Sequence, residues 1–289
     1  MAFFAASRAN NRGIALADAH DHASAIPHYL EAVRLSPSWS APWFNLGVAY
    51  KLTGDFAGSL RASERALAID REAAGEGAIW NVGIAATAVG DWAKARRAWK
   101  EFGIAIPDGE GPIDDAGAVT PIRLNPRGDG EVVWTLRIDP ARARIRSIPL
   151  PASGHRYDDL LLHDGAPNGY RQLQGQDVPV FDELTILEPS KYETWTVAIV
   201  APTGADVDNL VERLRAIDVP AEDWTTVRNL CAKCSTGTPH AHRGDEQAPA
   251  WTEDRNVAMA VRASVMEQAL TAWVSEDRGR SLSAPTRQL

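Results

Sequence analysis

Residues 43–70 read WFNLGVAYKLTGDFAGSLRASERALAID, and residues 79–107 read IWNVGIAATAVGDWAKARRAWKEFGIAIP. The two stretches share a glycine in their first half and a Gly-Asp pair seven residues later: Gly47 with Gly54-Asp55, and Gly83 with Gly90-Asp91. Self-similarity of this kind at a fixed interval is typical of stacked structural repeats. This half of the chain therefore decides the architecture that we expect.

A third copy precedes these two. Moving 34 residues toward the N-terminus from the middle copy takes Gly47 to Gly13 and Asp55 to Asp21. The last copy is offset by 36 residues, and we place its two extra residues within DREAAGEGA, residues 70–78. The sequence thus predicts three units over residues 6–109.

The units resemble the tetratricopeptide repeat, a helix–turn–helix of 34 residues. The middle unit carries the resemblance best, in Trp43, Leu46, Gly47, Tyr50, Gly54, Asp55, Ala66 and Leu67. It departs from the usual pattern at Ser59 and Ser63, where the family has alanine and an aromatic residue. The resemblance implies an all-α array in which neighbouring units bury a continuous core.

The resemblance also implies a concave groove, lined by the first helix of each unit, that binds a peptide or a partner protein. By position, the groove residues are Asn10, Ile14, Phe44, Val48, Lys51, Trp80, Ile84 and Thr87. Lys51 is the single cation among them, so we expect an apolar protein segment rather than a terminal carboxylate as the partner. The alternative is that the following domain covers the groove, because a large exposed apolar surface requires a cover.

The second half of the chain has a different organisation. Residues 110–119 are rich in glycine, proline and acidic residues and are expected to be a linker, and residues 120–278 are expected to form an α+β domain. Its expected strands are 120–125, 131–138, 144–150, 159–163, 181–187, 194–201, 222–230 and 256–262, and its expected helices are 205–217 and 264–274. The later part of this order favours a split β-α-β, ferredoxin-like layer with helices on one face. We expect residues 279–289 to be a disordered tail.

The segment CAKCSTGTPHAH places four metal-ligating side chains within twelve residues, at Cys231, Cys234, His240 and His242. Two thiolates and two imidazoles form a closed tetrahedral zinc site. The His-x-His spacing is shorter than that of common zinc fingers, so one histidine need not ligate. We expect one structural zinc ion in a loop over residues 231–242, and the alternatives are a solvent-exposed loop or a redox-active cysteine pair.

A second polar cluster consists of His155, Asp158, Asp159, His163 and Asp164. These residue types can bind a metal or act as an acid–base pair. No motif of fixed geometry is matched, so we expect a strand that ends in a turn with solvated polar residues.

Charge and composition limit the possible partners. The net charge is −8, residues 1–109 hold 11 basic and 11 acidic side chains, and residues 110–289 hold 19 and 27. Neither half carries the concentrated positive charge that nucleic-acid binding requires. No apolar run approaches the ~20 residues of a membrane span, and two cysteines three positions apart offer no disulfide framework. We expect a cytoplasmic protein without nucleic-acid or membrane partners.

Together these patterns predict a multidomain chain, with an all-α tetratricopeptide-like array before an α+β domain that holds a small zinc loop. The predicted function is that of an interaction or adaptor protein, and an enzyme is not favoured because common catalytic motifs are missing. The rival hypotheses are a metal-dependent enzyme and a metal or redox sensor, both acting through the Cys/His cluster. The sequence does not identify the partner or the oligomeric state.

Overall fold

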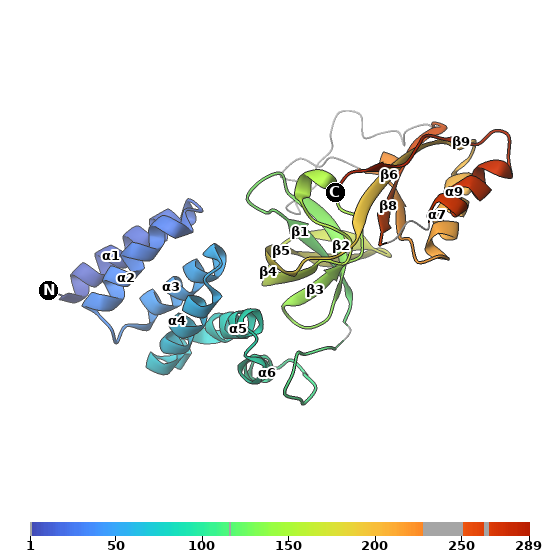
Figure 1. Cartoon of the computed structure of the whole chain (residues 1–289). Helices are drawn as coiled ribbons and strands as arrows, with labels where there is room; N and C mark the ends of the chain where they lie inside the picture. Colours follow the sequence, from blue (N-terminus) through green and yellow to red (C-terminus); the bar gives the residue numbers. More distant parts are fainter. Residues whose placement is uncertain (1, 116, 228–250, 263–265) are drawn as a thin grey trace. The chain divides into compact units, whose positions relative to one another are not determined.

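The computed structural model describes residues 2–115, 117–227, 251–262 and 266–289 (Figure 1). Contacts divide the chain into two compact units. The first contains Met1–Gly117, Arg137–Arg142 and Leu162–Gly165, and the second contains Ala118–Leu136, Ala143–Leu161 and Ala166–Leu289. Among the described residues, no helix combines the length and the apolar character needed to cross a bilayer.

Three pairs of helices follow one another in the first unit. They are α1 (Ala2–Asp18) with α2 (His22–Leu35), α3 (Ser40–Thr53) with α4 (Phe56–Ile69), and α5 (Arg71–Val89) with α6 (Trp92–Glu101). Contacts join α1 with α3 and α3 with α5, so the first helices of the pairs are neighbours. This is the order that the repeats in the sequence predict.

The turn inside each pair uses the same chemistry. The second helix begins after an aspartate whose carboxylate accepts a backbone N–H three residues further on: Asp21, Asp55 and Asp91. Such N-caps satisfy one of the amide donors that a helix start leaves open. The preceding residue is left-handed, with φ of 86° at Gly54 and 76° at Gly90, and His20 takes this place in the first pair with φ of 61°. The predicted register of the repeats is confirmed at this level.

The larger offset of the third pair has a local cause. Helix α5 contains a kink at Gly75, where φ is 63° and ψ is −170°. This conformation is open to glycine and strained for other residues. The kink lies within residues 70–78, where the sequence places the two inserted residues.

Each pair closes around a glycine of its first helix. A side-chain carbon added at Gly83 would lie 2.5–2.7 Å from ring atoms of Trp99, and one at Gly47 would lie 2.6 Å from the Ser63 hydroxyl. Gly13 is equally close to Tyr29. Ser59 and Ser63, the two departures from the family pattern, are both fully buried between the helices. The small residues therefore set the distance between the helices of each pair.

The buried side chain of Arg96 holds part of the chain after α6. The Arg96 guanidinium donates to the backbone carbonyls of Pro107, Gly111 and Pro112 at 3.1, 2.6 and 3.5 Å. A guanidinium offers five donors in a rigid plane and suits several carbonyls at once. The glycine- and proline-rich segment expected as a linker is thus tied to the last helix of the array.

Five strands form a closed barrel in the order β1-β2-β3-β4-β5. They are β1 (Val119–Leu124), β2 (Glu131–Arg137), β3 (Arg142–Ile145), β4 (Leu160–Leu173) and β5 (Gln176–Glu188). The barrel closes through a parallel pairing of β1 with β5, which aligns Ile122 with Phe181. Its interior holds Ile122, Leu124, Val133, Ala143, Ile145 and Leu161. The sequence predicts five strands here, but it places β3 too late, at residues 144–150, and ends β4 too early, at residue 163. It does not predict that the strands close on themselves.

The rest of the second unit is a sheet covered by two helices. It contains β6 (Glu193–Val200), α7 (Gly204–Arg215), β7 (Ala221–Asp223), β8 (Asp254–Val261) and α9 (Met266–Ser275). Strand β8 lies between β6 and β7 and is antiparallel to both, which is the strand order of a split β-α-β unit. Side chains of both helices share one core with the strands, including Leu210, Leu214, Leu270 and Trp273.

The expectation of a disordered tail is wrong for residues 279–289. Strands β9 (Ser281–Leu282) and β10 (Thr286–Arg287) both pair with β6 in antiparallel fashion. The backbone N–H of Thr194 also donates to the carbonyl of Leu289 at 2.9 Å. The segment is ordered by backbone hydrogen bonds to a neighbouring strand, which need no apolar side-chain pattern.

The close approach at Gly83 gives a stability prediction. Replacing Gly83 with alanine places a methyl group against the Trp99 ring and should destabilise the repeat unit by about 1–3 kcal/mol, the usual cost of overpacking. Gly77→Ala in the same helix is the matched control, because its added carbon meets Phe44 at 3.4 Å, an ordinary contact. It should stabilise by about 0.5–1 kcal/mol through helix propensity. Urea unfolding measures both changes, and a Gly83→Ala variant as stable as wild type would contradict this packing of α5 on α6.

Candidate protein-binding groove

The eight predicted groove residues all lie on the first helices of the pairs, but their exposure changes along the array. Ile14 on α1 is 37% exposed. Phe44 and Val48 on α3 and Trp80 on α5 are half-buried. Ile84 and Thr87, further along α5, are buried. The groove is therefore open at Ile14, and it is filled at Asn10, Lys51, Ile84 and Thr87.

Asn10 connects the first two pairs. Its side-chain oxygen accepts a hydrogen bond from the Asn45 amide at 3.0 Å, and Asn10 itself is buried. A buried polar group that has its partner within the protein stabilises the array. Asn10 thus has a structural role at the base of the groove.

Lys51 has its counter-charge within the same unit. Its ammonium group lies 2.8 Å from a carboxylate oxygen of Asp164, with side-chain exposures of 7% and 15%. The same Asp164 oxygen accepts the backbone N–H of Gly165 at 2.7 Å. Segment 162–165 thus supplies the acidic partner of Lys51, the single cation of the groove. The Lys51 ammonium group is therefore not available to a bound peptide.

Trp80 packs against the same segment. A side-chain carbon at Gly165 would fall within 2.2 Å of three atoms of the Trp80 indole, so only glycine permits this approach. The indole also contacts Trp99 and Phe102 edge to face, at centroid distances of 4.9 and 4.6 Å. Aromatic pairs in this geometry add stability beyond the area that they bury. Trp80 is therefore largely committed to contacts within its own unit.

The open end of the groove includes an aromatic residue that the repeat pattern did not single out. Phe3 is 56% exposed, and its ring packs at 5.1 Å against Trp39. Phe3 precedes Asn10 by seven residues and Ile14 by eleven, which places it on the same face of α1. Helical spacing from Asn10 was the signal that could have identified it.

The polar cluster of residues 155–164 does not form one site. The His155 imidazole contacts the Glu183 carboxylate at 2.7 Å and the Ser153 carbonyl at 2.9 Å. Asp159 accepts the backbone N–H groups of Arg156 and Ser190. His163 is fully buried and contacts the Asp164 carbonyl. Each of these side chains thus has its own structural contacts. The expectation of solvated polar residues at a strand-ending turn is wrong, because His155, Asp159 and His163 are buried and β4 continues to Leu173.

The two buried histidines are perturbed in opposite directions. Burial opposes charge on His155, but its contacts with Glu183 and Ser153 outweigh burial and raise its pKa above the ordinary 6.5. Burial and the nearby Arg137 lower the pKa of His163 to about 4. Folding therefore makes His155 easier to protonate and His163 harder to protonate.

His155 gives a prediction for stability against pH. Its contribution is fully present below about pH 6.5 and is lost as the pH rises through the raised folded pKa. The difference in unfolding free energy between wild type and His155→Gln should therefore shrink from about pH 6 to about pH 9. Urea titrations across this range measure it, with His28→Gln on α2 as the control. A difference that stays constant with pH would contradict the His155–Glu183 pairing.

The four predicted zinc ligands, Cys231, Cys234, His240 and His242, lie outside the described residues. Within the described part of the chain, no group of three or more His, Cys, Asp or Glu side chains is placed to hold a metal ion.

Comparison with known proteins finds likenesses in structure alone. No family model matches the chain, and no curated protein matches it. The solved structures that it resembles include the Arabidopsis OM64 TPR domain, with 18% identity over 35% of this chain and 83% of that one, at a TM-score of 0.33. They also include the N-terminal domain of the stress-induced protein STI-1 from C. elegans, with 24% identity over 35% and 84% at 0.32.

A third similar structure is the second TPR of Spaghetti (RPAP3) bound to an HSP90 peptide, with 17% identity over 34% of this chain and 89% of that one, at a TM-score of 0.32. All three likenesses cover about a third of the chain. The helix pairs, their aspartate caps and their glycine contacts show that the N-terminal segment is a helical repeat, consistent with the tetratricopeptide (TPR) type. The resemblance stated from the sequence is confirmed for this segment.

Proposed function

We propose that this chain is a protein-interaction adaptor that binds an apolar segment of a partner at the α1 end of its repeat groove. The observation that carries the proposal is the exposed apolar surface on α1. Ile14 and Phe3 face outward on α1, whereas Lys51 and Ile84 are buried further along the array. Exposed apolar side chains gathered on one helix face are typical of interaction surfaces.

The chemistry of the open end favours an apolar segment. Phe3, Ile14, Phe44 and Val48 are apolar, and Lys51 is paired with Asp164. A partner that relied on a terminal carboxylate would need cations at this end, and α1 presents none among the predicted groove positions. The charge distribution likewise supports a protein partner over a nucleic acid, because residues 1–109 are neutral and residues 110–289 are acidic.

The groove can be tested with a peptide selected on the protein itself. A library of displayed peptides is panned against the full chain, and the affinity of a selected peptide is measured by fluorescence anisotropy. Ile14→Asp and Val48→Asp should each weaken this peptide at least about tenfold, because each puts a charge into an apolar contact.

Leu30→Asp is the matched control for these variants. Leu30 is an exposed leucine on α2, outside the groove positions. It should leave peptide affinity within about twofold of wild type, since surface changes away from a contact have small effects. A peptide that binds Ile14→Asp, Val48→Asp and Leu30→Asp with wild-type affinity would contradict the location of the site.

We also propose a zinc site in the Cys/His segment, residues 231–242. Cys231, Cys234, His240 and His242 supply the thiolates and imidazoles that zinc prefers, and all lie within twelve residues. The ion's role would be structural, because a closed four-ligand site orders a segment that has few apolar residues of its own. A metal-dependent enzyme or a sensor that acts through the same residues is the alternative.

Elemental analysis tests the zinc site directly. The purified wild-type chain should contain one zinc ion, and Cys231→Ser should lose it, because a site without one thiolate binds far more weakly. Ser235→Ala, in the same segment, should keep it. Wild-type protein without zinc after growth in zinc-supplemented medium would refute the site. A structural ion should raise the melting temperature, so a chelator should lower it, whereas reversible loss of structure on oxidation would favour the sensor.

A further inference from the structure

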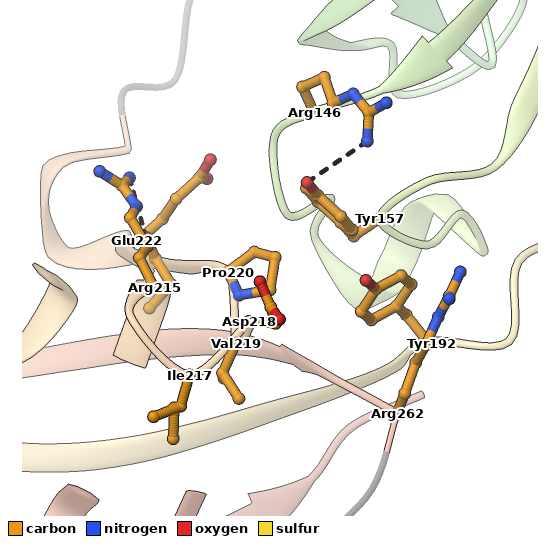
Figure 2. A pocket seen from close by; sticks show the side chains of 11 residues that line it. Arg146, Tyr157, Tyr192, Arg215, Ile217, Asp218, Val219, Pro220, Glu222 and Arg262 are labelled. Atoms are coloured by element: carbon orange, nitrogen blue, oxygen red, sulfur yellow. Dashed lines mark hydrogen bonds between the residues drawn. The ribbon is translucent and has the colours of Figure 1, made fainter. Parts of the chain in front are cut away.

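The second unit contains a cavity of about 660 Å³ that none of the predicted site residues lines (Figure 2). Its walls come from the segment after β3, from Tyr192 just before β6, from the turn between α7 and β7, and from Arg262 at the end of β8. A volume of this size is typical of small-molecule sites in proteins, which range from about 300 to 1,000 Å³.

One wall is made of two tyrosines and two arginines. The rings of Tyr157 and Tyr192 meet edge to face, with centroids 5.0 Å apart and an angle of 82° between their planes. The Arg262 guanidinium lies 4.1 Å from the centroid of the Tyr192 ring, and that of Arg146 lies 5.9 Å from the Tyr157 ring. Stacking of this kind holds a guanidinium in place and leaves its edge donors available for hydrogen bonds.

A single carboxylate positions both of these arginines. Asp158 contacts Arg146 with one oxygen at 2.9 Å and Arg262 with the other at 3.3 Å. One negative charge is thereby shared between two positive charges. This wall keeps an excess of positive charge, and its guanidinium groups are held in position before a ligand arrives, which lowers the entropic cost of binding.

The opposite wall adds a third arginine (Figure 2). Arg215, at the end of α7, donates to the Ala221 carbonyl at 3.2 Å, which uses one of its five N–H donors. Glu222 accepts the backbone N–H of Ile148 at 3.2 Å, and burial raises the pKa of its carboxyl group. Asp218 also lines this wall.

Arginine side chains are concentrated around the cavity, although Asp158, Asp218 and Glu222 balance their formal charge. Residues 110–289 carry 19 basic and 27 acidic side chains, yet the residues lining this cavity include three arginines and two acidic side chains. Guanidinium groups match the geometry of phosphate and carboxylate oxygens. We propose that this cavity binds a small organic anion, whose phosphate or carboxylate group is held by the arginines and whose planar ring lies against the tyrosines.

The test is isothermal titration of the full-length protein with three probes: phenyl phosphate, benzoate and inorganic phosphate. Phenyl phosphate or benzoate should bind saturably, and the tighter of the two identifies the anionic group. The ringed probe should bind at least about threefold more tightly than inorganic phosphate, because the tyrosines add stacking energy. Equal affinities would overturn the part assigned to the ring.

Two variants of α7 distinguish binding in the cavity from a general effect of the protein's charge. Arg215→Gln should weaken the tighter probe at least about tenfold, since it removes a charge-assisted donor. Arg213→Gln makes the same change in charge on α7, but Arg213 pairs with Glu276 and does not line the cavity. It should stay within about twofold of wild type.

A third variant tests whether removing a negative charge from the cavity strengthens anion binding. Asp218→Asn removes an opposing negative charge and should tighten binding about threefold at low salt, because like charges across a site disfavour an anion. Circular dichroism confirms that each variant is folded. The proposal is overturned if no ringed probe saturates below about 10 mM, a weak affinity even for small ligands. It is also overturned if Arg213→Gln weakens binding as much as Arg215→Gln does.

Discussion

The closeness of the two helices within each repeat is the constraint on which the N-terminal unit depends. At Gly13, Gly47 and Gly83 the first helix has no side chain, and a bulky or polar group of the second helix takes that space. Once the two helices are this close, the turn between them is short, and its geometry demands a left-handed residue followed by a capping aspartate. The first helices then lie as neighbours, and together they form the groove.

The same constraint explains which features could be predicted from the sequence. Gly54, Asp55, Gly90 and Asp91 each satisfy a local requirement of the backbone, so their repetition is enough to reveal the register of the helix pairs. Glycine alone would not reveal this turn in the first pair, because His20 takes the left-handed conformation that Gly54 and Gly90 take in the other two. The split order of β6, β8 and β7 was also predictable, since the alternation of strand and helix patterns restricts the topology.

Features that depend on distant pairings could not be predicted. Barrel closure joins Ile122 with Phe181, and nothing in the alternation of either strand specifies the other as its partner. Lys51 and Asp164 were each singled out in the sequence, but for different reasons, and their ion pair spans 113 positions. The arginine-lined cavity draws on four separate segments, none of which carries a motif. Only two residues of each tail strand pair with β6, too few to show a periodic pattern.

The pairing of the last residues with β6 has a consequence for the behaviour of the protein in solution. Without β9 and β10, one side of β6 would present unpaired N–H and C=O groups, because β8 occupies only the other side. An exposed strand of this kind is a template for strands of other molecules and promotes aggregation. The sequence of β6, TWTVAIV over residues 194–200, is apolar and rich in β-branched residues, which increases that hazard. Strands β9 and β10 therefore cover an edge of β6 that would otherwise be open to strands of other molecules.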